Sequence, residues 1–258
     1  MSQSPGYNTD SKESNFLVDF IVDVAELLKG ADSVAVLTGA GISAESGVGT
    51  FRDASGIWNK LDPSKWATEE GFRSSPSMVW EWYQDRRKII KDASPNKAHY
   101  SLVSLEKLGK KVTISTQNID NLHQQAGSKN VLELHGNIFR NKCIECGKPY
   151  AKEIMNDELC KCEFCGGIIR PDVVWYGEQL PQDVWQMSEQ AAIDSSIYLV
   201  IGTSGAVYPA AGLAILAKRA GSTVVIINTE PTELDDYADF VIREKAGIAM
   251  PEITARIR

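Results

Sequence analysis

Apolar residues recur along the chain in two patterns that predict different elements. Residues 16–29, FLVDFIVDVAELLK, place apolar side chains on one face of a helix, which Gly30 is positioned to end. Short runs rich in β-branched residues occur in SVAVLTGAGIS, KVTISTQN, SSIYLVIGTS and STVVIINTE, and DFVI is a further candidate strand. Buried strands separated by helical stretches are typical of a parallel α/β sheet, so the pattern predicts this fold class.

Two segments interrupt this alternation. Residues 62–110 have a helical pattern, clearest in PSMVWEWYQDRRKIIKD, and residues 140–170 contain all five cysteines. We expect the two modules to form a smaller lobe inserted into a Rossmann-like domain. That domain is expected to comprise residues 16–61, 111–139 and 171–258. The polar residues 1–15 lack the apolar core of a signal peptide and are expected to form a flexible tail.

Charge and composition narrow the classes of partner. The formal net charge is -7 at pH 7, so the surface is not suited to neutralising the phosphates of a nucleic acid. The longest apolar runs, such as SIYLVIG, are far shorter than the roughly 20 residues of a membrane span. Four of the five cysteines form Cys-x-x-Cys pairs, which favours metal binding in a reducing compartment, and we expect the cytoplasm. The oligomeric state is left open, and a monomer agrees with these observations.

Polar residues at the strand ends indicate where a ligand binds. In a parallel α/β sheet, ligands bind beyond the carboxyl ends of the strands, which here read TGAGIS, TQNID, GTSG and NTE. Residues 39–41 (GAG) allow a pyrophosphate to approach the backbone. Ala44 stands where the G-x-G-x-x-G fingerprint has glycine, however, so an ordinary tight turn is an alternative. Asn228 and Glu230 suit ribose hydroxyls, and residues 202–204 (GTS) add hydroxyl donors, so the three polar ends together favour a nucleotide.

The spacing of four cysteines predicts a zinc site. Cys143, Cys146, Cys162 and Cys165 form C-x2-C-x15-C-x2-C, which is typical of a closed tetrahedral site with a structural ion. Such a site has no open position for a catalytic water. Cys160 is an alternative ligand, but the second pair restores the two-residue gap. The inserted lobe is therefore predicted to be helical and zinc-binding.

His135 lies eight residues before the first cysteine pair and is one of three histidines in the chain. It could complete a zinc site, or it could be free to accept a proton, since imidazole has a reference pKa of about 6.5. Because four thiolates fill the zinc site, His135 is not needed there. An isolated histidine is usually a core residue with satisfied hydrogen bonds, and we assign that role to His99 and His123.

Several motifs follow one another in an order that resembles the sirtuins, the NAD-dependent protein lysine deacylases. They are GAGISAESGVGTFRDASGIW, TQNIDNLH, ELHG, the two cysteine pairs, RPDVVWYGE, GTSGAVYPAAG and NTEP, and they span about residues 34–248. In sirtuins, the acyl oxygen of an acyl-lysine attacks the nicotinamide ribose, nicotinamide leaves, and a histidine then activates a ribose hydroxyl. The resemblance makes His135 this general base and implies NAD and one structural Zn²⁺ as cofactors. Free lysine and O-acyl-ADP-ribose would be products.

The resemblance also implies the residues that bind NAD. Asn118 and Asp120 would hold the nicotinamide ribose and the carboxamide, and Phe51 would shield the reacting carbon from water. The full set of cofactor positions is Gly39, Ala40, Gly41, Ser43, Ala44, Glu45, Phe51, Arg52, Trp58, Gln117, Asn118, Ile119, Asp120, Gly202, Thr203, Ser204, Asn228, Thr229, Glu230 and Ala246.

Acyl-lysine proteins or peptides are the partners that this resemblance implies. The segment Val173, Val174, Trp175 and Tyr176 would offer its backbone edge to an extended peptide. Tyr83 and Arg86 share one helix face at i and i+3, and arginine can grip a carboxylate with two hydrogen bonds. A solvated basic face is the alternative, but the resemblance to the sirtuin branch with Tyr-x-x-Arg implies removal of succinyl, malonyl or glutaryl groups, with deacetylation also expected.

Two other functions use the same features. An ADP-ribosyltransferase would use the same NAD cleft but transfer the sugar to a protein nucleophile. A non-catalytic NAD-sensing module with a zinc ribbon would bind without turnover. A hydride-transfer enzyme is disfavoured because the usual dinucleotide fingerprint is missing.

Overall fold

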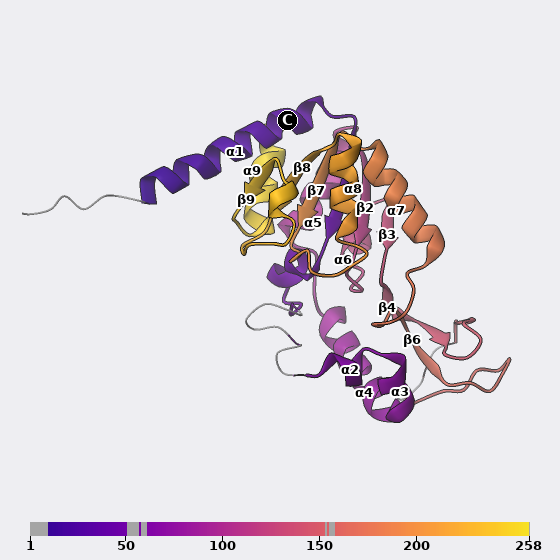
Figure 1. The fold of residues 1–258 in the computed structure, drawn as a ribbon. Coiled ribbons are helices and arrows are strands. Elements are labelled where there is room, and N and C mark those ends of the chain that lie inside the picture. Colours follow the sequence, from indigo (N-terminus) through magenta and orange to yellow (C-terminus); the bar gives the residue numbers. More distant parts are fainter. Residues whose placement is uncertain (1–9, 51–56, 58–60, 153, 155–157, 258) are drawn as a thin grey trace, which may run out of the picture.

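A parallel sheet of six strands forms the centre of the large domain (Figure 1). The computed structural model describes residues 10–50, 57, 61–152, 154 and 158–257. All neighbouring strands of the large sheet run parallel, as the sequence predicts. Five strands match the five predicted runs, and the short β3 is an addition. The spatial order is β3 (Val131–Glu133), β2 (Lys111–Thr116), β1 (Ser33–Thr38), β7 (Ile197–Ile201), β8 (Thr223–Ile227) and β9 (Phe240–Ile242).

Helices cover both faces of this sheet, because successive side chains of each strand point to opposite faces and both sets are apolar. In β1, Val34 and Val36 belong to one core, whereas Ala35 and Leu37 belong to the other. The first face is covered by α1 (Asp10–Gly30), α5 (Lys97–Lys107) and α9 (Ala246–Ile257). The second is covered by α7 (Gln182–Asp194) and α8 (Gly212–Ala220). Among the described helices, none combines the length and the apolar character needed to cross a membrane.

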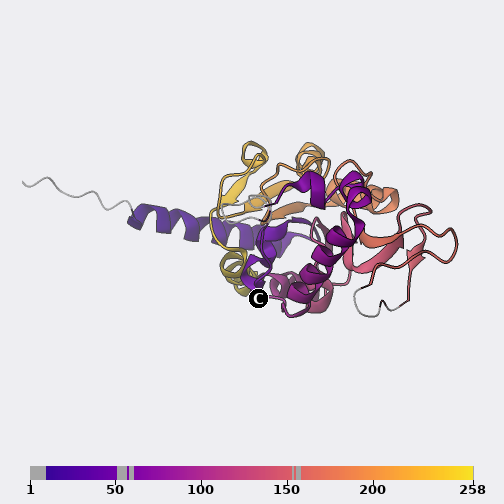
Figure 2. The ribbon, with the colours of Figure 1, turned by 90° about the horizontal axis from the view of Figure 1, so that it is seen from below.

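The first helix begins earlier than the sequence pattern indicates. The flexible tail was expected to reach residue 15, but α1 starts at Asp10 and ends at Gly30. Residues 10–15 are polar and contain neither glycine nor proline, so they can continue a helix without contributing to its apolar stripe. Apolar periodicity alone therefore places the start too late. In Figures 1 and 2, α1 extends away from the body on the side opposite the smaller sheet.

The predicted helical module of residues 62–110 divides between two cores. The helices α2 (Pro63–Trp66), α3 (Glu69–Ser74) and α4 (Pro76–Lys91) belong to the smaller lobe. In contrast, Ala98, Leu102 and Leu105 of α5 are fully buried in the core of the large domain. A helical pattern identifies an apolar face but not the element that covers it, and the boundary at residue 110 is therefore wrong for α5.

The smaller lobe combines these helices with an antiparallel sheet in the order β5 (Pro149–Tyr150), β4 (Gly136–Cys143) and β6 (Ile169–Val173). Arg87 of α4 ties the helices to this sheet, because its guanidinium donates to the carbonyl oxygen of Ile138 at 2.5 Å and to Asn141 Oδ1 at 2.6 Å. The expected boundaries at residues 139 and 170 fall inside β4 and β6. These two strands therefore run from the ligand-binding edge of the large sheet into the cysteine cluster.

Two of the three histidines lie in the interior of the large domain. His123, in α6 (Leu122–Ala126), is hydrogen-bonded through Nε2 to Thr38 Oγ1 at 3.0 Å. Its ring centre lies 4.9 Å from that of His99. The backbone N–H of Asn96 donates to His99 Nδ1, which completes a capping box at the start of α5. Burial lowers the pKa of His99 to about 4 and that of His123, which also faces His99, to about 3.

Both buried imidazoles should make the protein less stable in mild acid. Between pH 6.5 and their folded pKa values, the unfolded chain binds protons that the folded chain does not, so the free energy of unfolding falls as the pH falls. The two sites together contribute a slope of up to about 2.7 kcal/mol per pH unit. Urea unfolding at about pH 7 and about pH 5.5 measures this slope. His99→Gln should reduce it, since glutamine can serve at the same capping-box position; equal slopes in both proteins would contradict the assignment.

Candidate functional site

Glycines allow two strand ends of the large sheet to touch. After β1 the chain enters η1 (Ala40–Ser46), a 3-10 helix, and the backbone N–H of Gly41 donates to the carbonyl oxygen of Gly202 at 2.8 Å. A Cβ on Gly39 would lie 2.7 Å from that oxygen, and one on Gly41 would lie 2.7 Å from Gly202 Cα. Gly202 also has a positive φ of 64°. Residues 39–41 therefore form a tight turn and also allow another backbone to approach closely, because only glycine fits at Gly39, Gly41 and Gly202.

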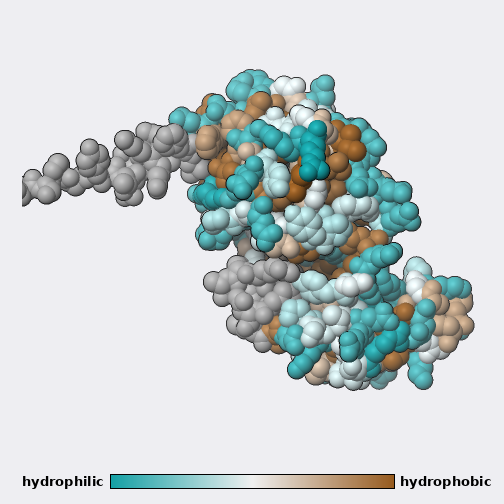
Figure 3. Space-filling model, viewed as in Figure 1, coloured by the Kyte–Doolittle hydropathy of each residue, from teal (hydrophilic) through white to brown (hydrophobic). Residues whose placement is uncertain are grey.

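A cavity of about 500 Å³ opens at this edge, between the sheet and the smaller lobe. Figure 3 shows the hollow between the two parts of the molecule. The cavity brings together residues from the four polar strand ends and from the smaller lobe. Of the expected positions, its wall contains Gly39, Ala40, Gly41, Tyr83, Arg86, Gln117, Asn118, Ile119, His135, Val173, Val174, Trp175, Tyr176, Gly202, Thr203, Ser204, Asn228, Thr229 and Glu230.

Five expected cofactor positions do not line the cavity: Ser43, Ala44, Glu45, Asp120 and Ala246. Ala44 is exposed, and Ala246, the first residue of α9, is buried in the core of the large domain. The carboxylate of Glu45 accepts a hydrogen bond from the backbone of Gly247 at 2.7 Å. A motif gives the position of a residue in the chain but not the direction of its side chain, so sequence similarity could not separate these residues from the lining.

Ser43 and Asp120 form a polar layer directly beneath the cavity wall. Ser43 Oγ donates to Asp120 Oδ2 at 2.7 Å, and the backbone N–H of Leu122 donates to Asp120 Oδ1 at 3.0 Å. The Asn118 amide donates to the carbonyl oxygen of Gly39 at 3.0 Å. Burial raises the pKa of Asp120, against these hydrogen bonds and the charge of Arg86, which lower it. The layer holds Asn118 in place at the wall. Phe51, Arg52 and Trp58 lie outside the described residues.

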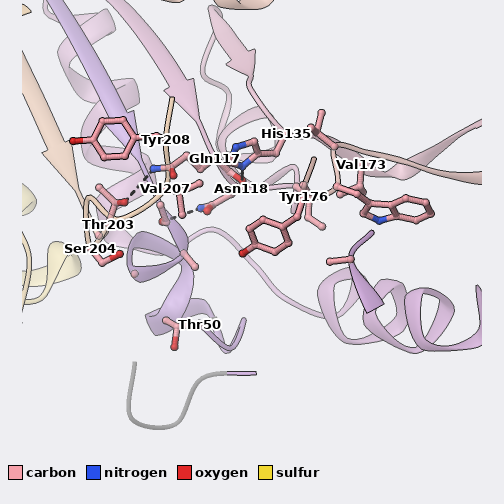
Figure 4. Close-up of a pocket in the computed structure, with 18 of the residues that line it drawn as sticks. Thr50, Gln117, Asn118, His135, Val173, Tyr176, Thr203, Ser204, Val207 and Tyr208 are labelled. Atoms are coloured by element: carbon pink, nitrogen blue, oxygen red, sulfur yellow. Dashed lines mark hydrogen bonds between the residues drawn. The ribbon is translucent and has the colours of Figure 1, made fainter. Parts of the chain in front are cut away.

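His135 sits where β3 passes into β4, and its ring faces the cavity beside Gln117 (Figure 4). His135 Nδ1 lies 3.0 Å from the carbonyl oxygen of Gln117. Because a carbonyl oxygen can only accept, Nδ1 carries the proton and Nε2 keeps its lone pair. Burial lowers the pKa of His135, while the bond to Gln117 raises it. The next residue, Gly136, has a φ of 76°, and a Cβ there would lie 2.1 Å from the Asp172 carbonyl oxygen.

The wall also contains residues that the sequence reasoning did not select. Trp82 stands next to the selected Tyr83 in the chain. Val207 and Tyr208, labelled in Figure 4, follow the polar end of β7 in a motif already quoted above. Their position in the chain, next to residues that were selected, was therefore the sequence signal that could have identified them. The additional lining residues are Thr50, Ala67, Trp82, Ile138, Gly177, Glu178, Leu180, Val207, Tyr208, Pro209 and Pro231.

The four predicted cysteines gather at the far end of β4. Their sulfur atoms all lie within 4.8 Å of one another, with Cys143 and Cys165 at 3.5 Å and Cys146 and Cys162 at 3.7 Å. Four thiolates around zinc, with Zn–S bonds of about 2.3 Å, have edges of about 3.8 Å. The donors therefore fit a tetrahedral structural zinc ion. Cys160 is not part of the cluster, and neither is His135.

Three comparisons with known proteins agree with this architecture. The family model described as Sir2 family matches residues 39–209. The NAD-dependent protein deacylase 2 of Pyrobaculum aerophilum is 45% identical over 238 residues, which cover 92% of this chain and 96% of that protein. A Sir2 homologue mutant solved with ADP-ribose is 39% identical with a TM-score of 0.87, over 92% of this chain and 96% of that one. A Sir2 variant solved with a deacetylated p53 peptide and 3′-O-acetyl ADP-ribose is 34% identical with a TM-score of 0.83. The match covers 90% of this chain and 96% of that one.

The parallel sheet, the cavity at its carboxyl edge and the sulfur-only cluster define an α/β nucleotide-binding class of protein with a smaller lobe whose cysteines are placed to bind zinc. Within this class, the chain belongs to the Sir2 family.

Replacement of single cysteines should separate the zinc ligands from the fifth thiol. Cys165→Ser should lose the bound zinc, which metal analysis of the purified protein measures. Its free energy of unfolding should fall by on the order of several kcal/mol, because zinc binding is part of the folding energy of such a lobe. Cys160→Ser is the matched control and should retain one zinc ion per chain. Loss of zinc from the control with retention in Cys165→Ser would contradict the assignment.

Proposed function

We propose that the chain is an NAD-dependent protein lysine deacylase that transfers the acyl group to ADP-ribose and releases nicotinamide. The observation that carries this proposal is the bond between His135 Nδ1 and the Gln117 carbonyl oxygen on the cavity wall. It leaves Nε2 as a base at the carboxyl edge of a parallel sheet, away from the cysteine cluster. A relative named as a deacylase and a Sir2 structure containing an acetyl ADP-ribose support the same reaction.

The cavity residues fit a dinucleotide. Gly39 and Gly41 have no side chains to prevent a pyrophosphate from reaching the backbone. Asn228 and Glu230 lie at the end of β8, where side-chain and backbone oxygens suit ribose hydroxyls. Bound NAD would supply the electrophilic ribose carbon and nicotinamide as leaving group. His135 Nε2 would accept the proton of a ribose hydroxyl, which can then attack the acyl carbon.

The acyl-lysine peptide would lie along residues 173–176. The backbone N–H groups of Val174 and Tyr176 already donate to the carbonyl oxygens of His135 and Ala67, both at 2.9 Å. The N–H of Trp175 donates to the carboxylate of Glu178. An extended peptide would therefore be recognised through carbonyl groups and side chains of this segment rather than through these three donors.

An acidic acyl group would suit the inner end of the cavity. Tyr83 and Arg86 line it from α4, and Arg86 is only 9% exposed. Burial lowers the pKa of Arg86, while Tyr83 and Asp120 raise it. A guanidinium beside a phenol is suited to the carboxylate of a succinyl, malonyl or glutaryl group, because arginine can bind a carboxylate with two parallel hydrogen bonds. Smaller acetyl groups would enter the same cavity without these hydrogen bonds.

Turnover with NAD labelled in its adenosine half tests the reaction class. We expect soluble labelled O-acyl-ADP-ribose from the wild type and a loss of at least about 10²-fold in kcat/KM for His135→Ala. Because burial keeps the pKa of His135 below its usual value, kcat/KM should be flat near pH 7 and fall only below about pH 6.5. His99→Gln, which does not alter the cavity wall, is the control. Transfer of label to protein would favour the ADP-ribosyltransferase, and absence of turnover would favour the NAD-sensing module.

Paired succinyl-lysine and acetyl-lysine peptides test the acyl class. Arg86→Met should lower kcat/KM for the succinyl peptide by about 10 to 100-fold, the value of a lost hydrogen bond to a charged group, and change acetyl turnover little. Lys88→Met is the matched control, because Lys88 lies on the same helix but pairs with Asp85 at the surface. Equal succinyl activity in wild type and Arg86→Met would refute the assignment.

A further inference from the structure

Trp175 connects the peptide segment to the acyl end of the cavity. It is 2% exposed, and its indole Nε1–H donates to the hydroxyl oxygen of Tyr83 at 2.8 Å. Its backbone N–H donates to Glu178 Oε2 at 2.9 Å. One residue of the predicted peptide-binding segment thus reaches the phenol that we assign to acyl recognition.

A partly buried ion pair holds the indole in this position. The guanidinium carbon of Arg170 lies 3.3 Å from the ring centre of Trp175, a close cation–π contact. Arg170 is paired with Glu178, and its Nη2 donates to the Val173 carbonyl oxygen at 2.6 Å. Because Glu178 also accepts from the Trp175 backbone, the pair restrains both the main chain and the ring of this residue.

The direction of the indole bond determines what the Tyr83 hydroxyl can do. A hydroxyl group has one hydrogen to donate and two lone pairs. Indole N–H can only donate, so Trp175 occupies a lone pair and leaves the Tyr83 hydrogen directed elsewhere. Among the residues that the structure describes, none accepts that hydrogen. Burial also raises the pKa of Tyr83, so the phenol keeps its proton at neutral pH.

We infer that Trp175 is a positioning residue for acyl selectivity: it orients the Tyr83 hydroxyl as a donor toward the cavity, where an acyl chain ending in a carboxylate accepts it beside Arg86. The inference rests on the proposed function, which it deepens. The residues of the peptide segment and of α4 then act together, and Arg170 with Glu178 keeps the indole in place. The ligand class favoured is an acyl group with a terminal hydrogen-bond acceptor of negative charge.

A role in packing alone is the alternative, because the Trp175 ring also contacts Phe72 at 5.3 Å between ring centres. Packing and orientation predict different results in a double-mutant cycle. Loss of packing would lower the turnover of all peptides. Loss of orientation would lower succinyl turnover selectively, and only while the Tyr83 hydroxyl is present.

The experiment measures kcat/KM for succinyl and acetyl peptides in wild type, Trp175→Phe, Tyr83→Phe and the double variant. We expect Trp175→Phe to lower the succinyl-to-acetyl ratio by about 3 to 10-fold, corresponding to one hydrogen bond, and to have no further effect on the ratio in Tyr83→Phe. The ratio is taken within one preparation, so an unfolded fraction cancels. Trp66→Phe removes an indole from the same lobe without a bond to Tyr83 and should leave the ratio unchanged. Arg170→Lys, which removes the planar cation from the indole, should lower it if Trp175→Phe does not fold.

The outcomes distinguish the inference from the proposed function. If Arg86→Met changes the ratio but the effects of Trp175→Phe and Tyr83→Phe multiply, Trp175 does not act through Tyr83 and the inference alone fails. Equal loss of succinyl and acetyl turnover in Trp175→Phe would likewise overturn it. If Arg86→Met leaves succinyl turnover unchanged, the acidic acyl class itself fails and the inference fails with it.

Discussion

The whole ligand-binding edge depends on a close approach of two backbones at the ends of β1 and β7. Gly41 donates to the carbonyl oxygen of Gly202, and neither position has room for a Cβ. This contact brings the turn after β1 against the loop after β7, so that the two strand ends form one wall. The parallel direction of the sheet then adds the ends of β2 and β8 to the same edge. Larger side chains here would separate the loops and remove the cavity before any ligand could bind.

The imidazole of His135 and the cysteine cluster lie at opposite ends of β4. β4 begins beside His135 at the cavity and ends at Cys143 in the metal cluster. Four thiolates would complete the coordination of a zinc ion, and the Nδ1 hydrogen of His135 is donated to the carbonyl oxygen of Gln117. In the proposed function the imidazole would therefore be available for proton transfer, while a bound zinc ion would stabilise the lobe that carries one side of the cavity. Both proposed roles would depend on this separation, because a zinc-bound histidine could not serve as the base.

Buried polar groups give the cavity wall its rigidity. Ser43 and Asp120 support Asn118 from below, and the Arg170–Glu178 pair supports Trp175 from the smaller lobe. Such groups are costly to bury alone, and hydrogen bonds offset this cost for Ser43, Asp120 and Asn118. In Arg170 only the two terminal nitrogens have partners, while Nε is buried without one among the described residues. A wall that is restrained from both lobes is suited to hold a dinucleotide and an extended peptide in one relative orientation.

Chain order and residue type determined much of this protein. The β-branched runs predicted five of the six parallel strands, because buried strands need apolar side chains on both faces, and the cysteine spacing predicted the tetrahedral cluster. Those signals are local. The tertiary structure alone decided that α5 belongs to the large domain, that Ser43 and Asp120 lie beneath the wall rather than on it, and that Trp175 meets Tyr83. Each of these features depends on contacts between residues that are distant in sequence. The periodicity of apolar residues indicates that a face of an element is buried, but it does not identify the element that covers this face.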